Sequence, residues 1–355
     1  MQHFIVIGAA LAATWLCTPL VRFAGARWGI VAHSGGRHVH KGSVPCIGGV
    51  AMFVGFLTAV LTRYLGEHLF GWAPVLSRSG QRFLGVLAGI TLVFLVGVID
   101  DIIDIRPGQK LAGQIAAAGI VVFSGASIDF VGNPFGGGLI LLGLLSVPVT
   151  LFWIVGFANV INLIDGLDGL AAGVTAIAAV SLLILAEQSG QPVAAVVAAA
   201  LLGACLGFLR FNFHPASIFM GDSGALFLGF TLAVISLLGV MKSVAAITLA
   251  VPLLIIGVPV FDTFSAIVRR RRHGRPIQEA DKGHIHHRLL GRGFDQRQTV
   301  LIIYVWSIAL AVGGYAMRWA PPWLRLVTFA VLAILSAFMA YWLGLFEAAH
   351  HDGED

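Results

Sequence analysis

Apolar residues occur along this chain in long, nearly uninterrupted runs rather than at alternating positions. A helix needs about 20 mostly apolar residues to cross a lipid bilayer, and eleven runs approach or reach that length. They cover approximately residues 4–21, 47–65, 83–99, 111–127, 138–156, 170–187, 192–209, 223–241, 244–268, 299–317 and 323–345. The pattern predicts an all-α polytopic membrane protein with about eleven transmembrane helices, forming one membrane domain over residues 1–355. The first run lacks a basic flank and a small-residue cleavage site, so we expect a span rather than a signal peptide.

Composition supports the same fold class. Of the 355 residues, 58% are hydrophobic and 11% are charged, whereas ordinary soluble domains have about 45–50% and 25%. A water-soluble enzyme is therefore excluded. The net charge of +5 does not indicate nucleic acid, because excess Lys and Arg in a membrane chain mainly mark cytoplasmic loops. Cys17, Cys46 and Cys205 are odd in number and lack ligand spacing, so we expect packing residues rather than disulfides or a zinc site.

The charged residues are unevenly divided between the two sides of the predicted bundle. Most Lys and Arg residues fall on one side if the N-terminus lies outside, which predicts an N-out, C-in topology. The largest loop on the inner side covers residues 269–298 and carries an arginine run and a histidine cluster. Most acids and histidines lie on this side too, although acids contribute little to topology. The active site is therefore expected on the cytoplasmic face.

An acidic group ends the third predicted span. Asp100 and Asp101 are adjacent there, and Asp104 follows one helical turn later. Ionisable residues at membrane depth are costly and indicate function by default. The alternative is a solvated helix end, where the helix dipole disfavours acids.

A second polar segment places amides and acids at steps of three: Asn159, Asn162, Asp165 and Asp168. It contains no Lys or Arg. Oxygen ligands without nearby cations suit a hard metal such as Mg²⁺, which usually binds through one or two carboxylates plus substrate phosphates. A polar loop between helices is the alternative.

A third segment, residues 212–224, leads into another span and contains Phe219 and Asp222. Asp222 falls at an expected helix start and would serve as an N-cap on that ground alone. Next to the two acidic groups, the interpretation as a metal ligand is favoured.

Two inner loops are rich in basic residues. Arg269 to Arg272 fit a stop-transfer signal or an anchor to anionic lipids, while the histidines at 284, 286 and 287 suit a diphosphate, which needs several charge-assisted donors. Zinc is an alternative for the histidines, although the acid-rich partners favour a harder ion. Residues 38–49, including Lys41, form a basic and Gly-rich loop, which fits a phosphate-binding loop and a membrane-surface loop equally well.

Taken together, these segments resemble the polyprenyl-phosphate N-acetylhexosamine-1-phosphate transferase superfamily from about His40 to Gly293. Within it the chain is most similar to the bacterial branch that puts GlcNAc-1-phosphate on undecaprenyl phosphate (the WecA/TagO type). Residues 281–287 resemble the His-Ile-His-His signature of that branch, and the related MurNAc-pentapeptide translocase carries a different histidine loop. The eleven predicted spans also fit this branch better than the ten of the translocase.

The resemblance implies a role for each candidate site residue. Those that act on the lipid phosphate would be Asp100 and Asp101. The Mg²⁺ ligands, with Mn²⁺ as a substitute ion, would be Asp222 and Asn162. Nucleotide binding would involve Lys41, Asp165, Asp168 and Phe219, the last by stacking on uracil. The sugar diphosphate would be held by His284, His286 and His287. The sequence after the acidic pair departs from the commoner pattern, which leaves the role of Asp104 open.

The implied activity is a Mg-dependent phosphoglycosyltransferase reaction at the bacterial inner membrane. GlcNAc-1-phosphate would pass from the UDP-sugar to undecaprenyl phosphate, releasing UMP and initiating a cell-envelope glycan. Another UDP-HexNAc or a MurNAc-pentapeptide donor stays open, as does a homodimer. UDP-HexNAc, undecaprenyl phosphate and membrane lipids are the expected partners, and no nucleic acid is expected. An ion-coupled transporter is the alternative from another class, but transporters bind near the bilayer midplane, whereas these acids lie on one side.

Overall fold

The computed structural model describes residues 1–32, 44–132, 138–239, 257–272, 285–317 and 320–345. Helices dominate this part of the chain. They are α1 (Gln2–Trp28), α2 (Gly49–Leu69), α3 (Leu76–Ile103), α4 (Pro107–Phe123), α5 (Ser146–Ile164), α6 (Leu170–Gln188), α7 (Pro192–Asn212), α8 (Gly221–Gly239), α10 (Gly257–Arg272), α11 (Ile285–Gly291), α12 (Gln296–Met317) and α13 (Pro322–Trp342), with a short 3₁₀ turn η1 (Gly143–Leu145).

Only short strands accompany these helices in the described residues. Strand β1 (Val31–Ala32) pairs antiparallel with β2 (Val44–Pro45), and β3 (Phe130–Gly132) pairs antiparallel with β4 (Leu139–Leu141). Each sheet has two strands, so neither supplies a core. The prediction of an all-α polytopic membrane protein is confirmed.

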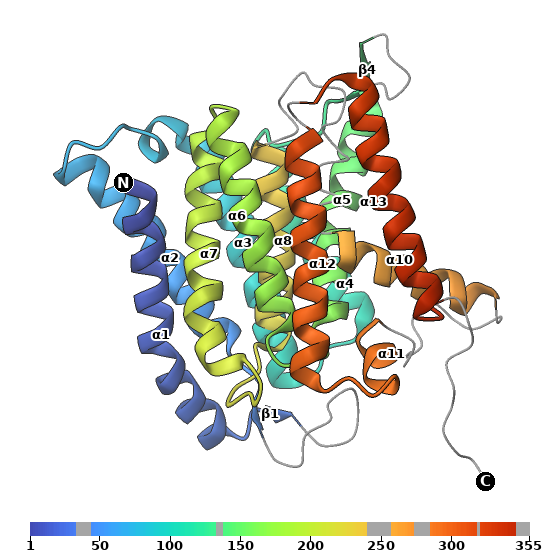
Figure 1. Ribbon diagram of the computed structural model, residues 1–355. Coiled ribbons are helices and arrows are strands. Elements are labelled where there is room, and N and C mark those ends of the chain that lie inside the picture. Colours follow the sequence, from blue (N-terminus) through green and yellow to red (C-terminus); the bar gives the residue numbers. More distant parts are fainter. Residues whose placement is uncertain (33–43, 133–137, 240–256, 273–284, 318–319, 346–355) are drawn as a thin grey trace.

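The helices pack around α8, which lies in the middle of the bundle, while α1 and α13 lie toward opposite edges (Figure 1). Within the most apolar stretch of α8, 94% of the residues are buried, against 22% for α1 and 6% for α13. Aromatic side chains fill the space beside α8: the ring of Phe53 stacks on Phe94 with centroids 4.0 Å apart and meets Phe227 edge-on at 5.6 Å. A helix buried all round belongs to the core of a membrane bundle, which makes α8 the fixed element around which the site is built.

The predicted spans match the helices well in number and less well in their ends. Among the described residues, nine helices are long and apolar enough to cross a membrane. Helices α4 and α10 have 17 and 16 residues and are shorter than that; α10 corresponds to the predicted span 244–268, whose first part lies outside the described residues. The orientation of the bundle in a membrane stays a prediction.

Two predicted segments have different ends or content in the structure. The span expected at 138–156 is α5, Ser146–Ile164, because the apolar residues Leu139–Leu141 form β4 and because Asn159 and Asn162 are helical despite being polar. The loop expected at 269–298 is partly helical: α10 runs on to Arg272, and α11 lies within the loop. Arginine is a good helix former, so a charge run marks the end of an apolar stretch without ending the helix.

Candidate active site

Four helices present polar residues at one end of the bundle. Helices α3 and α5 end there, while α4 and α8 begin there, so residues far apart in the sequence become neighbours. The polar residues concerned are Asp100 and Asp101 at the end of α3, Lys110 in the first turn of α4, Asn162 in the last turn of α5, and Asp222 in the first turn of α8.

Lys110 joins two of these helices through its ammonium group. Its Nζ lies 2.8 Å from Asp100 Oδ2 and 2.8 Å from Asp222 Oδ1. The amide of Asn162 also donates, through Nδ2, to Asp222 Oδ1. The lysine side chain is 17% exposed and that of Asp222 is 34% exposed. The pair is thus shielded from solvent on the lysine side and accessible on the side of Asp222.

Asp101 has a different role from its neighbour. Its Oδ1 accepts the backbone N–H of Asp222 at 2.6 Å and its Oδ2 accepts that of Ser223 at 3.1 Å. Free N–H groups at the start of a helix need such acceptors, so Asp101 caps α8 from another helix. The contact requires Gly221, which has a φ of 72° and at which a Cβ atom would lie 2.5 Å from Asp101 Oδ2.

The two carboxylate oxygens of Asp100 have different partners: Oδ2 pairs with Lys110, and Oδ1 contacts the backbone just after α3. Its Oδ1 accepts the backbone N–H of Ile105 at 3.0 Å, which fixes the chain as it leaves α3. Asp104 follows in a left-handed conformation with a φ of 50° and is exposed. The structure therefore separates the three acids that the sequence grouped together: Asp100 is paired with a cation, Asp101 holds α8, and Asp104 faces solvent.

Asp165 and Asp168 follow α5 in the loop before α6. Burial, together with the carboxylates of Asp222, Asp101 and Asp168, raises the pKa of Asp165 to about 8. Asp168 is 2% exposed, and its Oδ2 accepts the backbone N–H of Ala216 at 3.0 Å and lies 2.8 Å from His214 Nδ1. Asp165 thus faces the acidic cluster, whereas Asp168 holds the loop that leads to α8.

Helix α11, which carries His286 and His287, packs against the loop between α5 and α6. His286, in α11, is 3% exposed, and a Cβ atom at Gly166 would lie 2.7 Å from its Nε2. The rings of His286 and His287 have centroids 4.3 Å apart. Helix α11 is itself held by Asp262 of α10, whose Oδ1 accepts the backbone N–H of Ile285 at 2.7 Å. Because Gly166 has no side chain, the ring of His286 can approach the backbone there.

The remaining predicted site residues differ in outcome. Phe219 is 7% exposed, and its backbone is tied to the segment before α2 by the N–H of Phe219 to Pro45 O and the N–H of Gly48 to Phe219 O, at 2.8 and 2.9 Å. Stacking on a base would require more of the ring to become accessible, and this role stays a prediction. Lys41 and His284 lie outside the described residues.

The electrostatic balance of the cluster is negative. Four carboxylates, from Asp100, Asp101, Asp165 and Asp222, act on one another, and the ion pairs that they make within the described residues are those with Lys110. Burial, together with the carboxylates of Asp101, Asp165 and Asp222, also raises the pKa of the nearby Cys46 thiol. No three His, Cys, Asp or Glu side chains in the described part form a ready-made metal-binding group. The site therefore suits a ligand or ion that brings its own oxygen ligands or positive charge.

The sequence motifs predict most of this cluster but not Lys110. The lysine directly precedes the span that the apolar pattern begins at residue 111, and a lone lysine at a helix border does not by itself indicate a site. A usable signal was present: only a few residues separate the third and fourth predicted spans. A short connection makes consecutive helices antiparallel neighbours, and the first turn of α4 must then lie beside the acids that end α3.

The fold and the site define a multi-pass membrane protein with an acidic site at one end of its spans. Residues 83–240 match the family described as Glycosyl transferase family 4. The "Probable undecaprenyl-phosphate N-acetylglucosaminyl 1-phosphate transferase" of Bacillus subtilis (strain 168) is 35% identical over 336 residues, which cover 95% of this chain and 90% of the relative.

Two further relatives differ in lipid or sugar. The "Decaprenyl-phosphate N-acetylglucosaminephosphotransferase" of Mycobacterium tuberculosis (strain ATCC 25618 / H37Rv) is 38% identical over 340 residues, covering 88% of this chain and 82% of the relative. The "Phospho-N-acetylmuramoyl-pentapeptide-transferase" of Clostridioides difficile (strain 630) is 33% identical over 283 residues, covering 77% and 83%. The chain belongs to the polyprenyl-phosphate N-acetylhexosamine-1-phosphate transferase superfamily, which confirms the resemblance inferred from its motifs.

Proposed function

We propose that this chain transfers GlcNAc-1-phosphate from UDP-GlcNAc to undecaprenyl phosphate and releases UMP, as the first step of a cell-envelope glycan. The observation that carries the proposal is the acidic cluster with Lys110 at the ends of membrane spans, in a chain whose relatives are named for this reaction class. A lipid phosphate held by its chain in the bilayer meets a water-soluble nucleotide at that level. The transporter alternative has no comparable support among these relatives.

The reaction joins two anions, which sets the task of the side chains. An oxygen of the lipid phosphate attacks the β-phosphorus of the UDP-sugar, the bond from that phosphorus to the bridging oxygen breaks, and the electron pair leaves with UMP. Asp100 is suited to take a proton from the lipid phosphate, because its Oδ2 lies 2.8 Å from Lys110 Nζ and a phosphate attracted to that ammonium would approach this carboxylate. Lys110 offsets the repulsion between the reactants and the charge that develops on UMP.

The donor set of the cluster fits Mg²⁺. Asp222 is partly accessible, Asn162 donates through Nδ2 and so keeps its Oδ1 as an acceptor, and carboxylates outnumber cations. Asp222 and Asn162 would hold the ion, because Mg²⁺ commonly takes one or two carboxylates and completes its shell with water and substrate phosphates. When bound, Mg²⁺ or Mn²⁺ supplies charge neutralisation for the diphosphate.

Helix α11, with His286 and His287, is the proposed binding element for the sugar diphosphate. His286 is next to Gly166 and His287 packs on His286, so two ring systems border the loop that follows Asn162. Ring N–H groups can donate to phosphate oxygens in a fixed direction. By the resemblance of the motifs, His284 and Lys41 would add basic groups for the diphosphate and the nucleotide, and Asp165, Asp168 and Phe219 would bind the nucleotide. The excess of basic residues in the loops at this end supports a cytoplasmic orientation in a bacterial inner membrane.

Release of UMP by the purified protein tests the proposal. The full chain in detergent is given undecaprenyl phosphate and UDP-GlcNAc, with and without Mg²⁺, and UMP is measured together with a lipid diphosphate-sugar product. We expect both products in equal amounts and only with the divalent ion present. UDP-GalNAc and UDP-MurNAc-pentapeptide serve as competing donors, and a higher kcat/KM for either would replace GlcNAc as the substrate. Absence of UMP with all three donors would overturn the proposed activity.

A further inference from the structure

At the end of the bundle opposite the acidic cluster, a pocket lies between three helices. It has a volume of about 220 Å³ and is lined by Ser79, Arg82, Phe83, Val86, Gln191, Pro192, Val193, Ala194 and Leu238. These residues belong to the first turns of α3, the start of α7 and the last turn of α8. The pocket therefore lies at the level where the spans leave the apolar layer.

The only charged residue among those lining the pocket is Arg82. Its Nε is buried and makes no hydrogen bond among the described residues, and no ion pair of Arg82 occurs within them. The charge of Asp129 acts on Arg82, but the two side chains form no ion pair within the described residues. Asp129 Oδ1 instead accepts the hydroxyls of Ser127 and Ser146 at 2.7 and 2.9 Å. Within the described residues, the guanidinium thus lines the pocket with no carboxylate in direct contact.

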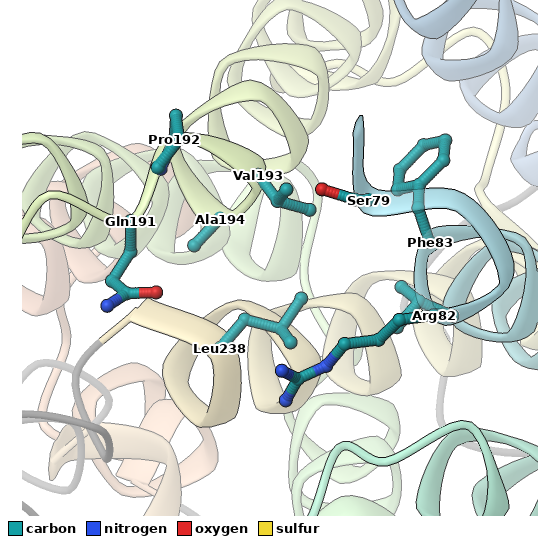
Figure 2. Close-up of a pocket in the computed structure, with 9 residues that line it drawn as sticks. Ser79, Arg82, Phe83, Gln191, Pro192, Val193, Ala194 and Leu238 are labelled. Atoms are coloured by element: carbon teal, nitrogen blue, oxygen red, sulfur yellow. The ribbon is translucent and has the colours of Figure 1, made fainter. Parts of the chain in front are cut away.

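The rest of the lining determines what kind of anion would fit. Figure 2 shows Arg82 extending from α3 past Leu238 of α8, with Gln191 and Ser79 on other sides of the same space. Ser79 and Gln191 add a hydroxyl and an amide as neutral donors, whereas Phe83, Val193 and Leu238 make the remaining walls apolar. A free anion gains nothing from apolar walls, but an amphiphile uses both parts. A guanidinium favours phosphate because its planar N–H groups match phosphate oxygens.

We propose that this pocket binds the phosphate group of an anionic membrane lipid, with Arg82 as the charged contact and Ser79 and Gln191 as neutral donors. Its volume far exceeds the 10–15 Å³ or so that one water needs, which leaves room for the phosphate and the first atoms of the glycerol. The site is separate from the acidic cluster, and it does not depend on the proposed transferase activity.

Lipid binding to matched arginine variants tests the proposal. Arg82→Gln removes the charge from the pocket, while Arg78→Gln removes one from an exposed position one helical turn earlier that does not line it. Native mass spectrometry of the full chain in detergent, titrated with short-chain phosphatidylglycerol, gives the Kd of each. We expect the Kd to rise about 10- to 150-fold for Arg82→Gln, the usual effect of losing a hydrogen bond to a charged group, and to stay within about twofold for Arg78→Gln.

Three further measurements keep the outcome decisive. A diacylglycerol with the same chains should not bind, and inorganic phosphate at the same concentration should not displace the lipid. Gln191→Glu, which puts a carboxylate beside Arg82, should weaken lipid binding as Arg82→Gln does, even if the latter fails to fold. Equal Kd values for Arg82→Gln and the unchanged protein, or equal losses in Arg78→Gln, would overturn the site. Displacement by inorganic phosphate would overturn the lipid as its occupant.

Discussion

The two ends of the helix bundle both hold buried charges, yet they balance them in opposite ways. At the end away from the acidic cluster, Arg63 of α2 forms an ion pair with Glu67 at 3.4 Å, and their side chains are 3% and 1% exposed. Arg63 also donates to Gln2 Oε1 and to the Ala73 carbonyl at 2.7 and 2.6 Å, and its guanidinium lies 5.4 Å from the Trp72 ring centroid.

The carboxylate of that pair accepts several hydrogen bonds. Glu67 accepts the backbone N–H groups of Val75, Leu76 and Ser77 at 3.0, 2.8 and 3.0 Å, and the hydroxyl of Ser77 at 2.8 Å. At the other end, Lys110 pairs with Asp100 and Asp222, while Asp101 and Asp165 of the same cluster make no ion pair within the described residues. A balanced pair holds a loop in place, whereas an excess of one charge is costly until a counter-charge binds. The imbalance, rather than burial itself, distinguishes the candidate active site.

The largest effect is expected from Asp222→Asn. An asparagine Oδ1 can still accept from Lys110 and Asn162, so the fold should be kept while the charge for Mg²⁺ is lost. We expect no detectable Mg²⁺-dependent UMP release, with an unchanged elution profile in detergent. Full activity would remove Asp222 from the metal site, and a misfolded variant would make it a structural residue.

The acidic end of α3 allows a comparison of three neighbouring residues. Asp100→Asn should lower kcat by about 10²–10⁴, the usual contribution of a positioned acid or base, whereas Asp104→Asn, a change at an exposed acid, should leave kcat within about twofold. Asp101→Asn should lower both kcat and thermal stability, because an amide group would turn an N–H toward the start of α8. Equal kcat values for the variants at 100 and 104 would contradict the assignment.

Phe219→Ala separates nucleotide binding from packing. If the ring stacks on uracil, the KM for UDP-GlcNAc should rise about 5- to 150-fold, which corresponds to a stacking energy of about 1–3 kcal/mol. If the buried ring only packs, the free energy of unfolding should fall by about 3–5 kcal/mol with an unchanged KM. KM and the melting temperature are measured on the same preparation, with Phe213→Ala as the control in the preceding loop.

Asp262 offers a milder test, because it acts on the histidine helix rather than on substrate. Asp262→Asn keeps an oxygen that accepts the Ile285 N–H, while Asp262→Leu leaves that N–H without an acceptor. We expect kcat/KM to fall about tenfold for the leucine variant, equivalent to about 1.4 kcal/mol, mainly through KM, and the asparagine variant to stay close to the unchanged protein. An equal loss in both would mean that the charge of Asp262 matters, not its position.

The smallest effect on turnover is expected from a change in the Arg63–Glu67 pair, at the end of the bundle away from the acidic cluster. Arg63→Met breaks a buried pair and leaves Glu67 uncompensated, which should lower the free energy of unfolding by about 3–5 kcal/mol. Because the change lies at the far end of the bundle, kcat of the folded fraction should stay within about twofold. A large fall in kcat at unchanged stability would show that the two ends are coupled.

Sequence alone could predict the acidic end in outline. Apolar runs fix where spans stop, and acids at stops on the same side must meet, which is why Asp100, Asp165 and Asp222 were found as a group. The different contacts that each of these acids makes could not be predicted. The cap that Asp101 provides for α8 and the contact of Asp168 with His214 depend on how helices approach in space, and no local pattern records that.

The predicted ends of a span differ from the helix ends where the helix continues through polar residues. Helix α5 continues through Asn159 and Asn162 because the amide of Asn159 pairs with Gln114 of α4, its Nδ2 lying 2.6 Å from Gln114 Oε1. A hydropathy pattern counts an amide as a place where a span stops. Inside a bundle, the same amide is satisfied by a neighbouring helix and the span goes on.

Helix α3 also acts as a ruler across the membrane. Arg82 and Asp100 are both on this helix, and the rise of about 1.5 Å per residue puts them about 27 Å apart along its axis. The hydrocarbon layer is about 30 Å thick. Helix α3 therefore holds the cation of Arg82 near one boundary of that layer and the carboxylate of Asp100 near the other. A thicker or thinner bilayer would move one of these charges into the acyl chains or lift it toward water. The acyl length of the surrounding lipids therefore sets how deep the acceptor phosphate must sit to reach Asp100.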